Sequence, residues 1–109
     1  MRNEEPASKD DAGQDIVLMN FTAPADLQWF FLKYAVSIAA FDNELGAIAA
    51  APFEHLLSFH GEGYISSVET EHRTNQNFSR MTTGAWQCGM SDEIWSAIEA
   101  IQAAVIDPI

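Results

Sequence analysis

Cysteine and basic residues are what this sequence has least of. Its 109 residues include one cysteine, Cys88, and five Lys or Arg against sixteen Asp or Glu. A single cysteine cannot form an internal disulfide, which favours a reducing compartment. The first fifteen residues lack the apolar stretch of a secretory signal. The most apolar run, 23–41, carries Pro24, Asp26 and Lys33, which indicates a buried helix rather than a membrane span. We therefore expect a cytoplasmic protein.

The shortage of basic residues leaves a formal net charge of −11. Residues 1–15 contribute five acids and two bases, a net of −3, and residues 16–109 contribute eleven acids and three bases, a net of −8. Most of the surplus thus lies outside the N-terminal segment. It argues against binding to nucleic-acid phosphates, because there is no basic patch to neutralise them. The negative charge is consistent with a basic protein partner, which it would attract over a distance. Alternatively, the charge serves only to keep the protein soluble.

Helical spacing of apolar residues recurs along most of the chain, and no convincing strand pattern interrupts it. We predict an all-α fold, a compact orthogonal bundle of five or six short helices, with HEAT-like hairpins as one option. Residues 1–14 are predicted to be a flexible, disordered acidic tail, and residues 15–109 a single helical domain. The segment 15–21, DIVLMNF, is either an extended arm or a helical turn on the body, because so short a run does not distinguish them.

The helix around which the sequence is organised is predicted between Pro52 and Gly61. Proline suits the first position of a helix, where its missing N–H is not needed, and glycine suits a left-handed stop. A break is expected at Ala51, since the residue before proline avoids helical angles. Glu54 falls in the predicted first turn, where its carboxylate would meet the positive end of the helix dipole.

A longer helix is predicted over 22–42, and it is apolar on nearly every side. One face carries Leu27, Phe30, Tyr34, Ile38 and Phe41. The other carries much of the remaining apolar content, with Trp29, Leu32 and Val36. Such a helix is either central to the fold or covered by a partner, and we favour the central position.

Shorter helices are predicted in the remainder of the chain. Asp42 or Asn43 caps a helix over 44–50, and Thr74 or Asn75 caps one over 76–86 that Gly84 weakens or ends early. A helix over 62–73 follows the Gly61 corner. Ser91 caps the last helix, whose inward face is expected to contain Ile94, Ile98, Ile101 and Val105.

Few residues suggest catalysis or metal binding. His55 and His60 lie five positions apart and cannot chelate one metal from the same helix face. Glu69 and His72 have the Glu-x-x-His spacing of di-iron bundles, but only one copy occurs. Cys88 has no activating signature around it. We therefore predict no cofactor, no metal and no catalytic residues, with an enzyme that uses Glu54 and His60 as a minor alternative.

Residues 45–98 resemble a family of small bacterial domains of unknown function. The likeness lies in I-A-A-A-P-F-E-H-L-L at 48–57, H-G at 60–61, Y-I at 64–65 and V-E at 68–69, then N-F at 77–78, Gly84 and Trp86. The family pattern has A-x-G-P-L-E-x-L-L, H-G, I-x-x-[VI]-E, F-R-x-x-L-G and a Trp. Ala51 replaces its usual Gly, M-T-T-G at 81–84 replaces its Leu-Gly step, and His72 and Arg73 stand where it has a small alanine. The resemblance implies an all-α domain with no assigned activity.

Small acidic domains of this kind are often regarded as immunity proteins, and this analogy shapes the functional prediction. We predict a protein that binds a basic partner, as an immunity factor or inhibitor of a toxin or effector. An acidic nucleic-acid mimic that blocks a DNA- or RNA-binding protein is the alternative. The predicted partner-binding residues lie on the polar stripes of the helices over 62–73 and 92–105: Glu62, Ser66, Glu69, Asp92 and Glu99.

Overall fold

The computed structural model describes residues 23–109, which form helices and connecting loops without strands. The elements are α2 (Ala25–Ile38), α3 (Asp42–Ile48), the π-helical turn η1 (Ala49–Phe53), α4 (Glu54–Thr74), α5 (Gln76–Thr82) and α6 (Asp92–Ala104). The all-α prediction is confirmed. The predicted tail over 1–14 and the open question of residues 15–21 lie outside the described residues.

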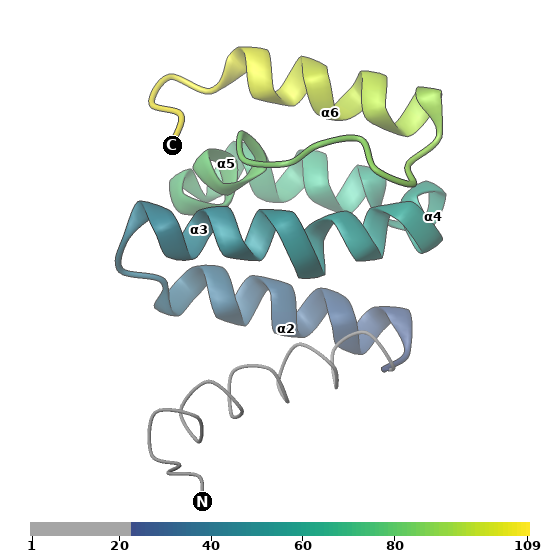
Figure 1. Cartoon of the computed structure of the whole chain (residues 1–109), viewed down its shortest axis with the longest axis horizontal. Coiled ribbons are helices and arrows are strands. Elements are labelled where there is room, and N and C mark those ends of the chain that lie inside the picture. Colours follow the sequence, from purple (N-terminus) through teal and green to yellow (C-terminus); the bar gives the residue numbers. More distant parts are fainter. Residues whose placement is uncertain (1–22) are drawn as a thin grey trace, which may run out of the picture.

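The described residues make four continuous helical stretches, so the predicted five or six separate helices are wrong in number. α3, η1 and α4 follow one another without a break and count as one stretch from residue 42 to residue 74. Figure 1 shows this stretch in the middle of the molecule, with α2 along one outer side and α6 along the opposite side. Each outer helix packs on the long middle stretch.

Pro52 does not begin a helix as predicted, and the predicted stop at Gly61 is misplaced by one residue, because α4 kinks at His60 and continues. Pro52 sits inside η1, where the wider turn accommodates a residue that cannot donate a backbone hydrogen bond. Gly61 has no positive φ, and the chain bends instead at His60, whose φ of −135° and ψ of 21° are non-helical. A Cβ on Gly61 would lie 3.0 Å from Ile94 Cγ1. The glycine therefore allows α4 and α6 to approach closely.

The ends of α3, α5 and α6 depend on polar side chains. Asn75 accepts the Phe78 N–H at 3.0 Å and Ser91 accepts the Ile94 N–H at 3.2 Å, which confirms both caps. α5 ends at Thr82, two residues before Gly84, so the shorter form of that prediction is correct. The predicted cap of α3 is wrong. Its first turn is held by Glu44, whose carboxylate accepts the N–H groups of residues 40 and 41.

The core runs through the long middle stretch and receives one face of each neighbouring helix. From α6 it takes Ile94, Ile98 and Ile101, as predicted, whereas Val105 is only half-buried beyond the end of the helix. The most deeply buried large side chains are Phe53, Phe78, Leu32, Leu45, Leu56, Leu57, Met81, Ile98, Val36 and Val68. From α2 the core takes Leu32 and Val36, with the polar Gln28 beside them.

Candidate functional site

Glu54 carries the one buried carboxylate among residues 23–109. Glu54 is 7% exposed, and its oxygens accept the Trp86 N–H at 2.7 Å and the Cys88 thiol at 3.0 Å. A buried acid is tolerated only when hydrogen bonds replace its lost water. Glu54 does not sit at a helix N-terminus as predicted, because η1 precedes it without a break. Its structural role is to fix the loop over 86–88 against α4.

Cys88 lies at the surface in a conformation that is uncommon for its residue type. Its φ of 47° falls in the left-handed region that favours glycine. The pKa of its thiol is raised, mainly by the hydrogen bond it donates to Glu54, and further by desolvation and by the negative charge of that carboxylate. The thiol therefore stays protonated at neutral pH, which makes it a poor nucleophile.

The structure does not bring Glu54 and His60 into one cavity. Glu54 lines a hollow of about 590 Å³ together with His55, Ser58 and Cys88. His60 lines a different hollow of about 270 Å³, beside the bend of α4. Both oxygens of Glu54 already accept hydrogen bonds. The geometry therefore gives the alternative Glu54/His60 enzyme no shared site.

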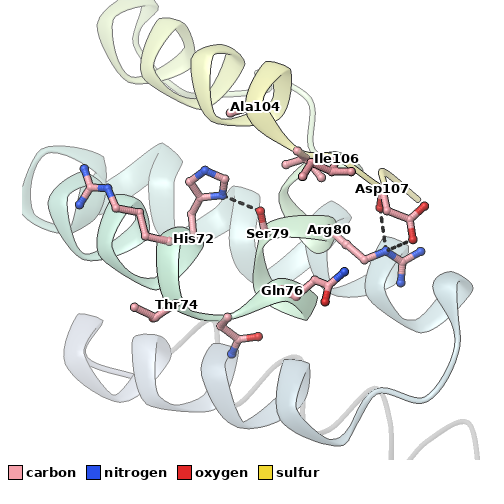
Figure 2. Close-up of a pocket in the computed structure, with 11 residues that line it drawn as sticks. His72, Thr74, Gln76, Ser79, Arg80, Ala104, Ile106 and Asp107 are labelled. Atoms are coloured by element: carbon pink, nitrogen blue, oxygen red, sulfur yellow. Dashed lines mark hydrogen bonds and ion pairs between the residues drawn. The ribbon is translucent and has the colours of Figure 1, made fainter.

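A second polar cluster, missed by the sequence analysis, lies between α5 and the C-terminal residues. His72 Nδ1 and Ser79 Oγ are 2.5 Å apart at the wall of a hollow of about 570 Å³ (Figure 2). The two residues lie seven positions apart on different helices, so no sequence spacing indicated the pair. Ser79 is 8% exposed, and the bond serves to join the end of α4 to α5.

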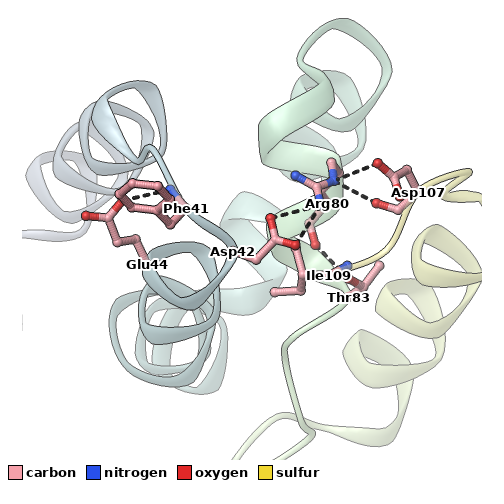
Figure 3. Close-up of polar contacts among 7 residues, drawn as sticks. All are labelled: Phe41, Asp42, Glu44, Arg80, Thr83, Asp107 and Ile109. Atoms are coloured by element: carbon pink, nitrogen blue, oxygen red, sulfur yellow. Dashed lines mark hydrogen bonds and ion pairs between the residues drawn. The ribbon is translucent and has the colours of Figure 1, made fainter.

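Arg80 lies at the same wall and is held between two acids. Its guanidinium donates to both carboxylate oxygens of Asp42 at 2.9 and 3.1 Å and to the Asp107 backbone oxygen at 2.7 Å. Figure 3 shows this arginine between the two acids, with Thr83 accepting the Ile109 N–H nearby. These contacts tie α3, α5 and the C-terminal segment together. They also occupy one of only three Lys or Arg residues within 23–109.

The predicted partner-binding residues occupy the surfaces of α4 and α6. Four are exposed and Glu69 is half-buried. Glu62 lines the same hollow as Ser91, the residue before Asp92, so these two acids lie where α4 and α6 meet. Asp92 also accepts a hydrogen bond from Gln87 at 2.9 Å. Their role in binding stays a prediction, as do the roles of the remaining three, Ser66, Glu69 and Glu99.

The largest departure from expectation is on α2. We favoured a central helix that is buried on both sides, but one apolar face is exposed and only the opposite face, with Leu32 and Val36, enters the core. We call the exposed set the α2 stripe; its side chains are 43 to 69% exposed, and it consists of Leu27, Phe30, Tyr34, Ile38 and Phe41. Four of its members belong to α2, which lies along one outer side of the described helices (Figure 1). Of the two alternatives, the central helix is therefore wrong and an uncovered aromatic face is what the described residues present.

The described residues offer neither a metal site nor a membrane span. Nowhere in 23–109 do three or more His, Cys, Asp or Glu side chains gather in a way that would hold a metal ion. Within the same range, no helix combines the length and apolar character needed to cross a bilayer.

The chain belongs to a family of unknown function, DUF6869, whose sequence model matches residues 2–106. Membership of a family without an assigned activity is thereby confirmed, over a longer region than residues 45–98. The bacterial origin and the motif that we attached to the resemblance stay predictions. No curated protein and no solved structure matches the chain.

Proposed function

We propose that this member of the DUF6869 family works by binding another protein, and that the partner lays an apolar helix with basic flanks on the α2 stripe. The observation that carries the proposal is the stripe itself, five large apolar side chains left exposed, four of them along α2 and Phe41 just beyond its end. Contiguous exposed apolar surface on a small domain marks an interaction site, whereas single exposed apolar residues are ordinary.

The spacing of the α2 stripe supports a helical partner. The four members within α2 follow one another at intervals of three, four and four residues, which keeps them on one side of the helix. A second amphipathic helix meets such a row with its own apolar residues at the same intervals. Four of the five members lie within α2 itself, so a rigid element presents most of the surface.

The charge of the body supports a basic partner. Residues 23–109 contain eleven acids and three bases, a net of −8, and Arg80 is already paired with Asp42 and Asp107. An unbalanced acidic surface speeds the approach of a basic protein and has less effect on how long it stays. In this proposal the acids of α4 and α6 attract the partner, and the α2 stripe makes the lasting contact. A toxin or effector inhibited by this protein has the required chemistry.

The test uses a designed probe, a fluorescent helical peptide with leucines along one face and lysines elsewhere. We expect the full chain to bind it, with an affinity that falls as salt rises, and not to bind the matching peptide with glutamates. Phe30→Ser with Ile38→Ser should weaken binding by roughly tenfold or more, because each residue loses apolar contact. Phe59→Ser is the control, since Phe59 is 70% exposed but lies outside the stripe. Equal losses in both variants would contradict the proposal.

The steering part of the proposal has a separate readout, the association rate. Glu62→Lys with Glu69→Lys should slow association of the lysine peptide, and the difference should shrink as salt shortens the Debye length below about 8 Å. Glu4→Lys with Glu5→Lys changes the charge equally at the N-terminal end and should have a smaller effect. Equal slowing by both pairs, or a rate that does not depend on salt, would count against steering.

A further inference from the structure

We infer that the hollow beside Glu54 binds an organic cation, an alkylammonium group on a short apolar stem. This Glu54 hollow has a volume of about 590 Å³ and is lined by residues of η1, of the first part of α4, and of the loop at 88–89. It shares no residue with the α2 stripe. The inference therefore does not rest on the proposed function, and each can fail without the other.

The charge of Glu54 has no basic partner among the Lys and Arg residues of 23–109. The side chain is 7% exposed, and its two hydrogen bonds come from neutral donors, a backbone N–H and a thiol. Buried charges in proteins are usually paired with an opposite charge. The three Lys and Arg residues of this range lie elsewhere: Lys33 over the Trp29 ring, Arg73 at the hollow drawn in Figure 2, and Arg80 against two acids. The described fold thus leaves this charge for a ligand to neutralise.

The carboxylate of Glu54 has room for further hydrogen bonds. A carboxylate oxygen can accept two, and each oxygen of Glu54 accepts one, Oε2 from Trp86 and Oε1 from Cys88. An ammonium group carries three N–H donors and no acceptor, so it can supply the bonds that remain. Hydrogen bonds between two charged groups are also shorter and stronger than those from neutral donors. Because Trp86 and Cys88 already hold the carboxylate in place, little ordering is needed when a ligand binds.

The remainder of the wall fits an apolar stem. Ala50 and Ala51 line the Glu54 hollow from η1, and Phe59 lines it from α4 with a side chain that is 70% exposed. Aromatic rings attract cations as well as alkyl chains. An inorganic cation such as Ca²⁺ needs six or more oxygen ligands, and the described residues offer no cluster of that kind. One carboxylate in a mainly apolar wall therefore favours an alkyl amine.

Titration of the isotope-labelled full chain with butylammonium chloride tests the site. The titration is run at about pH 8, where an imidazole is mostly neutral and an alkylammonium is charged. We expect saturable changes in the amide shifts of residues 50–59 and 86–89. Butanol, and sodium chloride at the same ionic strength, should not produce them. Changes that sodium chloride reproduces, or that follow the acids of α4 and α6 instead, would overturn the inference.

The source of the amine is distinguished by a second probe, Nα-acetyl-lysine amide, which carries the same group on a four-carbon stem. Tighter binding of this probe than of butylammonium would support the site and assign it to a basic side chain of another protein. Tighter binding of butylammonium would support the site and assign it to a free amine. Saturation by neither probe would overturn the inference.

Paired variants test the wall and the charge. Ala50→Leu fills the Glu54 hollow from an exposed position and should weaken butylammonium binding by about tenfold or more. Ala47→Leu is the control, because Ala47 is also exposed but does not line the hollow. Glu54→Gln removes the charge and should weaken binding to a similar degree, whereas Glu62→Gln, at a different hollow, should not. If Glu54→Gln does not fold, the alanine pair decides alone. Equal affinities in the two leucine variants would overturn the inference.

Discussion

The carboxylate of Glu54 is buried although it is charged, and the α2 stripe is exposed although it is apolar. Charged groups are usually exposed and apolar groups buried, so both are exceptions. They differ in whether other described residues supply partners for them. Glu54 finds its partners inside the described fold, at Trp86 and Cys88. The stripe has only partial cover among the described residues, since its members stay 43 to 69% exposed. A buried polar group with partners indicates a structural role, whereas an apolar row without cover indicates a surface that another segment or protein completes.

The two regions should respond very differently to the same substitution. Phe53, beside Glu54 in the chain, is fully buried, whereas Phe30 is 59% exposed. Phe53→Ala should lower the free energy of unfolding by about 3–5 kcal/mol, because it removes a core ring and leaves a cavity. Phe30→Ala should lower it by no more than about 1 kcal/mol. Urea unfolding measures both, and similar losses would remove the distinction between the regions.

Removing the Glu54 carboxylate should have the next largest effect. Glu54→Ala leaves the Trp86 N–H and the Cys88 thiol without their acceptor and should destabilise the fold by about 1–3 kcal/mol. Glu54→Gln keeps one acceptor oxygen and should lose less. Amide exchange at Trp86 should accelerate in the alanine variant. If both variants have the stability of the parent protein and the Trp86 amide stays protected from exchange, then Glu54 does not fix the loop over 86–88.

The smallest predicted effect is a pH dependence at Cys88. Its folded pKa is raised above the ordinary thiol value of 9.0, so the protonated thiol is the form that the fold favours. This contribution to stability is complete below about pH 9 and is lost as the pH rises through the raised value. Rates of reaction with a thiol reagent across alkaline pH should show a midpoint above that of the unfolded chain. Glu54→Gln should lower the midpoint, and an unchanged midpoint would argue against the hydrogen bond as its cause.

The sequence predicted those features that depend on neighbouring residues. Ser91 caps α6, Asn75 caps α5, and Ile94, Ile98 and Ile101 face inward, because caps and helical spacing act over a few positions. The positions of Pro52 and Gly61 did not follow the usual preference of these residues for the first position and the C-terminal stop of a helix. The proline is accommodated in a π-turn, and the glycine is needed for contact with Ile94. Tertiary packing overrode both local preferences.

The candidate site was less predictable, since it depends on contacts between distant residues. Trp86 and Cys88 lie 32 and 34 positions from Glu54, and no periodic pattern links them. On α2 both faces are apolar, so spacing identified the helix but not the side that is buried. Leu32 and Val36 enter the core although the opposite face carries more aromatic surface. Which face of α2 is buried depends on how its side chains pack against the middle stretch, residues 42–74.

The most direct test of the central claim is a map of where the lysine peptide binds. The isotope-labelled full chain would be titrated with the peptide while backbone amide shifts are followed. We predict that the largest shift changes fall over residues 25–41, with small changes over 92–104. Changes concentrated on α6 and the second half of α4, or spread evenly along the chain, would contradict the assignment of the α2 stripe as the binding surface.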